Sequence, residues 1–255
     1  MSGGGGAKGI AYVIERDADN IWLVNSSPIV TRSLQKVFPQ SFRDLTPIAS
    51  AIGDYSAIAV KRSSEFKTIT DLAKQQRQQP RSVAIAGGSI TGSTDHIVAA
   101  MVFKGFGSDP ATIKYIPYDA GGKAMAGLLS GEVQALSSGL GEVIDLTRQG
   151  FVRILCVTSP VRLPVAPDTP TCLESGATDA EFVNWRGFFA GPGLDPLLGE
   201  QYQELLAAMY ASDAWRTIRA RNGWVDIYVP GKKFRAMLEA QEQTLKRLMT
   251  ELGLL

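Results

Sequence analysis

The chain has 255 residues, of which 45% are hydrophobic and 20% charged, enough for one large domain or two of ordinary size. Its 26 Lys and Arg residues nearly balance 25 Asp and Glu residues, and the basic ones are scattered, which argues against a nucleic-acid surface. No apolar run is long enough to cross a bilayer, and the first six residues have neither the basic start nor the apolar core of a secretory signal.

Short apolar runs alternate with helical patterns from Ile21 to Ser159. We expect strands at 21–24, 45–52, 56–61, 83–86, 113–116, 133–136 and 152–157, with the second and third separated at 53–55. Helices are expected from Pro28, from about residue 70, and over 93–103, 122–129 and 142–148. Strands separated by helices of this length predict an α/β fold with parallel-rich sheets flanked by helices.

The pattern changes after Ser159, where four prolines mark a surface connection. A short helix is expected at 172–176, followed by an apolar crossing segment at 182–190. Amphipathic helices are predicted over 196–211, 215–221 and 233–252, with a last short strand at 224–228.

Few residues suit metal binding or catalysis. His96 is the single histidine, and no Cys-x-x-Cys or His-Glu-x-x-His spacing is present, so we expect neither a metal nor a cofactor. No Gly-x-Ser-x-Gly elbow and no Gly-Lys-Ser/Thr phosphate loop occurs, so an enzyme is the third choice of function. Cys156 and Cys172 are interpreted as two buried small hydrophobic residues, with a disulfide between them as the minority alternative.

The most informative segment is Gly87–Asp95, between an expected strand and an expected helix. It contains glycines and small hydroxyl residues but no Lys or Arg. Such a turn exposes backbone N–H groups at the positive end of a helix dipole, which is a ready site for a carboxylate. The sequence therefore predicts that this loop holds a small acid.

Two further loops at expected strand ends share this composition, over 117–122 and 137–141. Each could be an ordinary turn, but loops that follow parallel strands converge at one edge of a sheet. Ser89, Thr91, Asp119 and Ser137 are candidate ligand contacts on this basis. Asp95 could instead serve the helix dipole, and His96 could simply be packed.

Several motifs resemble one known family. They are Asp44–Ala49, Gly92–His96, Tyr118–Gly122, Leu128–Val133, Val157–Ser159 and Asn184–Ala190. Together, and in this order, they resemble the substrate-binding proteins of tripartite tricarboxylate transporters, also called Bug or TctC-like extracytoplasmic solute receptors.

The resemblance implies a two-lobed periplasmic binding protein of type II, with the ligand in a cleft between the lobes. The first lobe would comprise residues 1–82 and 185–255, and the second residues 83–184. It also implies a periplasmic location, a small organic acid of the tricarboxylate or dicarboxylate type as ligand, delivery to membrane permease subunits, and, we expect, a monomer. By position, it assigns ligand contacts to Gly92, Ser93, Thr94, Asp95, Tyr118, Gly121 and Gly122, and from the first lobe to Ser26, Ser27, Asp54 and Tyr55.

Family members carry a signal peptide, a strand, a loop rich in proline and glycine, a helix and another strand before the glycine cluster seen here at Gly3–Gly6. This segment is missing, so we expect a first lobe that lacks strands and a weakened site. The alternative function, from a different class, is a ligand sensor for a signalling system without transport.

Overall fold

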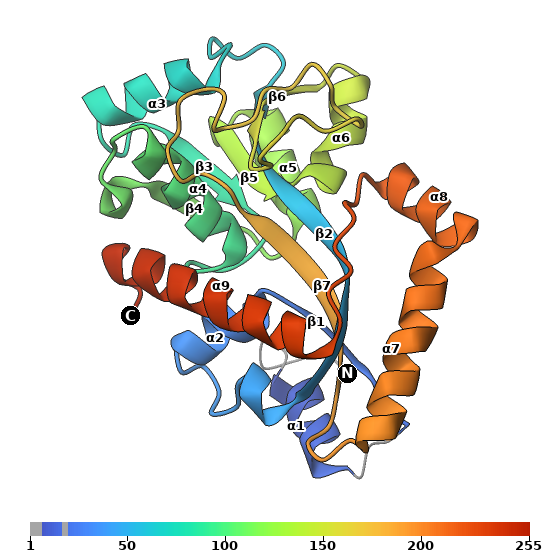
Figure 1. The fold of residues 1–255 in the computed structure, drawn as a ribbon. Helices are drawn as coiled ribbons and strands as arrows, with labels where there is room; N and C mark the ends of the chain where they lie inside the picture. The colour runs from blue at the N-terminus through green and yellow to red at the C-terminus, as the bar shows by residue number, and fades with distance from the viewer. Residues whose placement is uncertain (1–6, 17–19) are drawn as a thin grey trace. The chain divides into compact units, whose positions relative to one another are not determined.

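The computed structural model describes residues 7–16 and 20–255, so the cluster Gly3–Gly6 lies outside it (Figure 1). These residues divide into two compact units. Unit 1 contains the described residues up to Gly53, together with Trp185–Arg247 and Leu255. Unit 2 contains Asp54–Asn184 and Leu248–Leu254. Residues 54–82, which we expected in the first lobe, belong to unit 2. The reason is that residues 56–61 form part of a long strand and pair with two other strands of unit 2.

Unit 1 is built around short strands and long helices. Its elements are α1 (Ala7–Glu15), β1 (Leu23–Ser26), α2 (Pro28–Leu34), a 3-10 helix (Phe42–Asp44), the first half of β2 (Thr46–Lys61), most of β7 (Val183–Ala190), α7 (Pro196–Ala211), α8 (Asp213–Asn222) and most of α9 (Gly231–Glu251). β1 pairs antiparallel with β7. The rings of Trp185, Phe189 and Phe234 meet at centroid distances of 5.2 to 6.0 Å in its core. Trp185 is thus a packing residue.

Unit 2 contains a mixed sheet with strand order β6-β2-β5-β3-β4. Its elements are the rest of β2, α3 (Ile69–Gln78), β3 (Ala84–Gly87), α4 (Thr94–Gly105), a 3-10 helix (Pro110–Thr112), β4 (Lys114–Pro117), α5 (Gly121–Ser130), β5 (Ala135–Gly139), α6 (Leu140–Arg148) and β6 (Val152–Val157). β3 is parallel to β4 and β5, whereas β2 runs antiparallel between β5 and β6. The fully regular parallel succession expected from the sequence is therefore interrupted by β2.

Three local expectations differ from the structure. β2 continues from Thr46 to Lys61 without a break at Gly53, because bridging to Val225 keeps the backbone there extended. Residues 172–176 form turns rather than a helix, and residues 224–228 make only that isolated bridge rather than a strand. Among the described helices, none combines the length and apolar character that a bilayer crossing requires.

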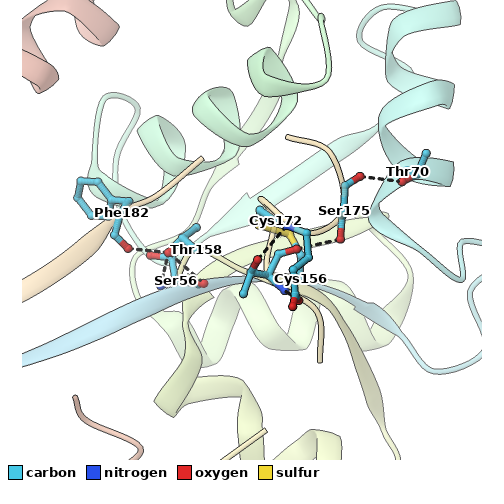
Figure 2. The surroundings of a disulfide bond; sticks show 9 residues. Ser56, Thr70, Cys156, Thr158, Cys172, Ser175 and Phe182 are labelled. Carbon is cyan, nitrogen blue, oxygen red and sulfur yellow. Dashed lines mark hydrogen bonds between the residues drawn. A yellow bond between two sulfur atoms is a disulfide. The ribbon is translucent and has the colours of Figure 1, made fainter. Parts of the chain in front are cut away.

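Cys156 and Cys172 form a disulfide, so the interpretation of two unpaired cysteines is wrong (Figure 2). Periodicity placed both residues in the core but could not show that a distant loop returns to β6. The N–H of Cys172 donates to the carbonyl of Val157 over 2.8 Å, and the N–H of Val157 donates to that of Pro170. Beside this segment, the Thr158 hydroxyl donates to the carbonyl of Phe182 over 2.6 Å. The disulfide thus fixes the proline-rich connection against the end of β6.

Replacing both cysteines by alanine should lower the free energy of unfolding by about 3 kcal/mol, because the bond closes a loop between residues 16 apart in sequence. Urea unfolding monitored by circular dichroism measures the difference. The wild-type chain unfolded with dithiothreitol present should match the double variant. An unchanged urea midpoint in both cases would contradict a stabilising disulfide.

Candidate ligand-binding site

The loop that leads from β3 into α4 carries open backbone donors. β3 ends at Gly87, and α4 begins at Thr94 after Ser93, the extended residue before the helix. Gly92 has a φ of +79°, a left-handed conformation that favours glycine. The first hydrogen bond of the helix runs from the Ile97 N–H to the Ser93 carbonyl. The N–H groups of residues 94, 95 and 96 therefore precede the helical ladder and can serve a ligand.

Two other amides of the loop are already bonded to side chains of α4. The Gly88 N–H donates to Asp95 Oδ2 over 2.9 Å, and the Gly92 N–H donates to His96 Nδ1 over 3.0 Å. His96 is buried and stacks on Tyr115 at a centroid distance of 4.6 Å. Of the two alternatives for His96, the structure shows the packed one. Asp95 accepts the hydrogen bond from the Gly88 amide and therefore helps to fix the conformation of the loop.

Tyr115 is a residue of this site that sequence reasoning missed. Its hydroxyl donates to the Ser89 carbonyl over 2.8 Å and lies 3.3 Å from Ser93 Oγ. The alternation of β4 could have indicated it, since the neighbouring Lys114 is exposed while Tyr115 is partly buried. Through these two contacts Tyr115 helps to fix the position of the loop between β3 and α4.

The three glycine-rich loops lie together in unit 2. β3, β4 and β5 run parallel, so their carboxyl ends share one edge of the sheet. A Cβ added at Gly88 would be 2.5 Å from the backbone nitrogen of Gly121, so these two backbones touch. A Cβ at Gly121 would overlap the Glu142 carboxylate, and one at Gly139 would overlap that of Asp54. The expected convergence is therefore present.

A cavity of about 390 Å³ opens beside these loops. It is lined by Gly121, Gly122, Met125, Leu136, Ser138, Glu142 and Leu146. The Ser138 hydroxyl donates to Glu142 Oε2 over 2.6 Å across its wall. Mixed apolar and polar walls of this kind suit a small molecule.

Other predicted contacts belong to unit 1 or to the opposite face of β2, and their contact with a ligand stays a prediction. Ser26 and Ser27 belong to unit 1, where Ser26 ends β1 and buried Ser27 precedes α2. Tyr55 follows Asp54 on a strand, so its side chain points to the opposite face.

In the second loop, the Tyr118 side chain lies against Gly127, well along α5 from Gly121. Asp119 is exposed and pairs with Lys123 over 3.0 Å. Thr91 is exposed and Gly122 has open space around it, while Ser137 is fully buried in β5. Within unit 2, the predicted residues that converge are Asp54, Ser89, Gly92, Ser93, Thr94, Asp95 and Gly121.

Negative charge dominates the electrostatics of this region. Burial raises the pKa of Asp95 to about 6, with help from the charges of Glu142 and Asp54 and against the hydrogen bond from Gly88. Burial lowers the pKa of His96 to about 4, so its ring is neutral at pH 7. None of the three loops contains Lys or Arg. These loops themselves can therefore hold an anion only by dipoles and hydrogen bonds.

Open amides at a helix start, in an α/β fold with glycine-rich loops at one sheet edge, suit a protein that binds a small anion. Residues 12–254 match the tripartite tricarboxylate transporter family receptor, TctC, and the chain belongs to this family.

Individual proteins are similar to the chain over most of its length. The chain is 27% identical over 223 residues to a UPF0065 protein from the tcbD-tcbE intergenic region of Pseudomonas sp. (strain P51), a match that covers 86% of this chain but 65% of that protein. It resembles the structure of R. palustris Rpa4515 with adipate, with a TM-score of 0.86, 24% identity, and coverage of 99% of this chain and 85% of that one. It also resembles the periplasmic binding protein BugD, with a TM-score of 0.82, 21% identity and the same coverage.

Replacing Gly88 by alanine should lower the free energy of unfolding by about 1–3 kcal/mol, because the new methyl group meets the Gly121 backbone. Gly122→Ala is the matched control: nothing lies within 4 Å of its Cβ position, and alanine favours the helix. Chemical denaturation of both variants measures the effect. Equal stability of the two would disprove the close approach.

Asp95→Asn should be more stable than wild type at pH 8, by up to roughly 2 kcal/mol, and equal to it near pH 4. The folded chain holds the Asp95 proton more tightly than the unfolded chain, so this residue costs stability as the pH rises from about 4 through about 6. His96 has the opposite sign, losing stability as the pH falls from 6.5 toward 4, but it is common to both proteins.

Urea unfolding across this pH range measures the difference between the two proteins. Exposed Asp145, which pairs with Arg148 on α6, supplies the control variant Asp145→Asn. A difference that is the same at pH 4 and pH 8 would refute the assigned cause.

Proposed function

We propose that this chain is a receptor that captures a small organic acid at the start of α4 and delivers it to membrane permease subunits. The observation that carries the proposal is the set of open N–H groups at residues 94–96, beside two glycine-rich loops. Amides at a helix start bind carboxylates through both hydrogen bonds and the helix dipole. The family's name and the adipate in the related R. palustris structure support the class of ligand.

The proposed contacts in unit 2 are the residues that converge around this helix start. Ser93 and Thr94 contribute hydroxyl groups, and the Thr94 Oγ1 atom is buried without a hydrogen-bond partner among the described residues. Gly92 and Gly121 allow close approach to the backbone, and Gly122, also a predicted contact, lines the neighbouring cavity. Recognition by amides, hydroxyls and bridging water does not require an arginine.

We propose a periplasmic location as well. The Cys156–Cys172 disulfide supports it, because such bonds persist in oxidising compartments. The related BugD structure is of a periplasmic binding protein, which agrees.

Thermal-shift measurements with adipate, malate, citrate and benzoate test the ligand class. A bound acid should raise the melting temperature as its concentration rises, since it stabilises only the folded chain. Glucose, which has no carboxylate, serves as the negative control. If no acid shifts the transition at any concentration up to 10 mM, the proposed function is wrong.

Thr94→Pro should weaken binding of the stabilising acid by about ten- to a hundredfold while leaving the fold intact. Proline removes the amide of residue 94 but suits the first position of a helix, and Ser93 already has the extended conformation that proline requires (φ −72°, ψ 170°).

Asp213→Pro is the matched control. It makes the same change at the first residue of α8, after extended Ser212, in unit 1. Isothermal titration calorimetry measures both affinities. Unchanged affinity in Thr94→Pro would exclude this amide from the site.

A further inference from the structure

Three carboxylates lie around the amides at the start of α4. Asp95 is in its first turn, Asp54 comes from β2 and Glu142 from α6. We call these three residues the acidic cluster. Asp54 and Glu142 both act on Asp95 electrostatically, and each abuts a glycine of a neighbouring loop. An incoming carboxylate therefore adds negative charge where negative charge is already concentrated.

We propose that this receptor binds its acid together with one proton, which Asp95 carries in the complex. The inference rests on the proposed function, and it defines the ligand more narrowly as a carboxylate without a compensating positive charge of its own. The proton comes from solvent and goes to the Asp95 carboxylate. Asp95 thereby changes from a repelling anion into a neutral group that can donate a hydrogen bond to the ligand.

The neighbours of Asp95 favour it as the proton carrier. His96, next on α4, cannot take this role without losing the Gly92 hydrogen bond, because its Nδ1 atom is the acceptor. Tyr115 of β4 is neutral and its hydroxyl is committed to the Ser89 carbonyl. Glu142 is exposed and accepts from the Ser138 hydroxyl. Asp95 already binds the proton more tightly than an ordinary carboxyl, with a pKa of about 6.

Two independent features mark this place as a site. Thr94 is 8% exposed, and its hydroxyl oxygen has no hydrogen-bond partner in the described part of the chain. A cavity of about 390 Å³ is lined by Glu142 and by Gly121, whose backbone touches Gly88 of the loop before α4. A ligand oxygen at the start of α4 would satisfy the Thr94 hydroxyl and the open amides together.

Proton-linked binding has a definite pH signature. Above the pKa of Asp95 in the ligand-free chain, each unit of pH should raise the Kd about tenfold, because the concentration of free protons falls tenfold. From pH 6.5 to pH 7.5 we expect the Kd for adipate or malate to rise about tenfold in the wild-type chain. At these pH values both acids remain fully ionised or nearly so.

Asp95→Asn should bind the same acid with a Kd that changes less than twofold over this range. Asparagine keeps an oxygen for the Gly88 amide and is always neutral, so at pH 7.5 it should bind at least as tightly as wild type. Asp145→Asn, on the exposed surface of α6, should keep the full pH dependence. Calorimetric titration of all three proteins makes the comparison.

Proton uptake by the wild-type chain provides a second measurement that needs no variant. Titrations at pH 7.5 in phosphate and in Tris, which differ in ionisation enthalpy, should report close to one proton taken up for each acid bound. Uptake near zero, or an Asp95→Asn variant with wild-type pH dependence, would overturn the proposal. So would tight, pH-independent binding of an amino acid such as aspartate when adipate, malate and citrate all fail to bind.

The two proposals fail differently. If no acid binds between pH 5.5 and pH 8, the proposed function is wrong. If an acid binds with equal affinity at pH 6.5 and 7.5, the receptor stands and only the proton linkage is rejected.

Discussion

The backbones of Gly88 and Gly121 touch at the carboxyl edge of the unit 2 sheet, and the candidate site depends on this contact. It brings the loop after β3 against the loop after β4, so that α4 and α5 both begin at this edge of the sheet. Only two residues without side chains can approach so closely. The hydrogen bond from the Gly88 amide to Asp95 then fixes the orientation of the first turn of α4.

In the proposed site, the groups that attract an anion and the groups that repel it are different. The attraction comes from backbone dipoles at a helix start, whereas the fixed charges nearby, on Asp54, Asp95 and Glu142, repel an anion. A carboxylate can be held under these conditions if one of the neighbouring acids is neutral when the ligand is bound. The same residue that shapes the loop is the one that carries the proton in our proposal. Structure and ligand preference would then be coupled through Asp95.

The local sequence pattern predicts the form of the loops, but it does not predict which distant side chains pack against them. Gly87–Asp95 was predicted as strand, turn and helix start from its apolar run, glycines and hydroxyl residues, and the structure has this form. Tyr115 was missed because nothing in its own neighbourhood indicates that it reaches the loop 26 residues earlier. The family resemblance assigns ligand contacts to Tyr55 and Tyr118. In the structure the Tyr55 side chain lies on the opposite face of β2 from that of Asp54, and the Tyr118 side chain lies against Gly127 of α5.

By itself the sequence determined the α/β class, most of the elements, the three glycine-rich loops and the family, because these depend on short-range periodicity and on motifs read in order. Tertiary structure decided how distant segments meet: the antiparallel insertion of β2 between β5 and β6, the disulfide between Cys156 and Cys172, and the gathering of three carboxylates at one helix start. Such pairings join residues far apart in the chain. Their energies depend on burial and distance in three dimensions, which no local pattern contains.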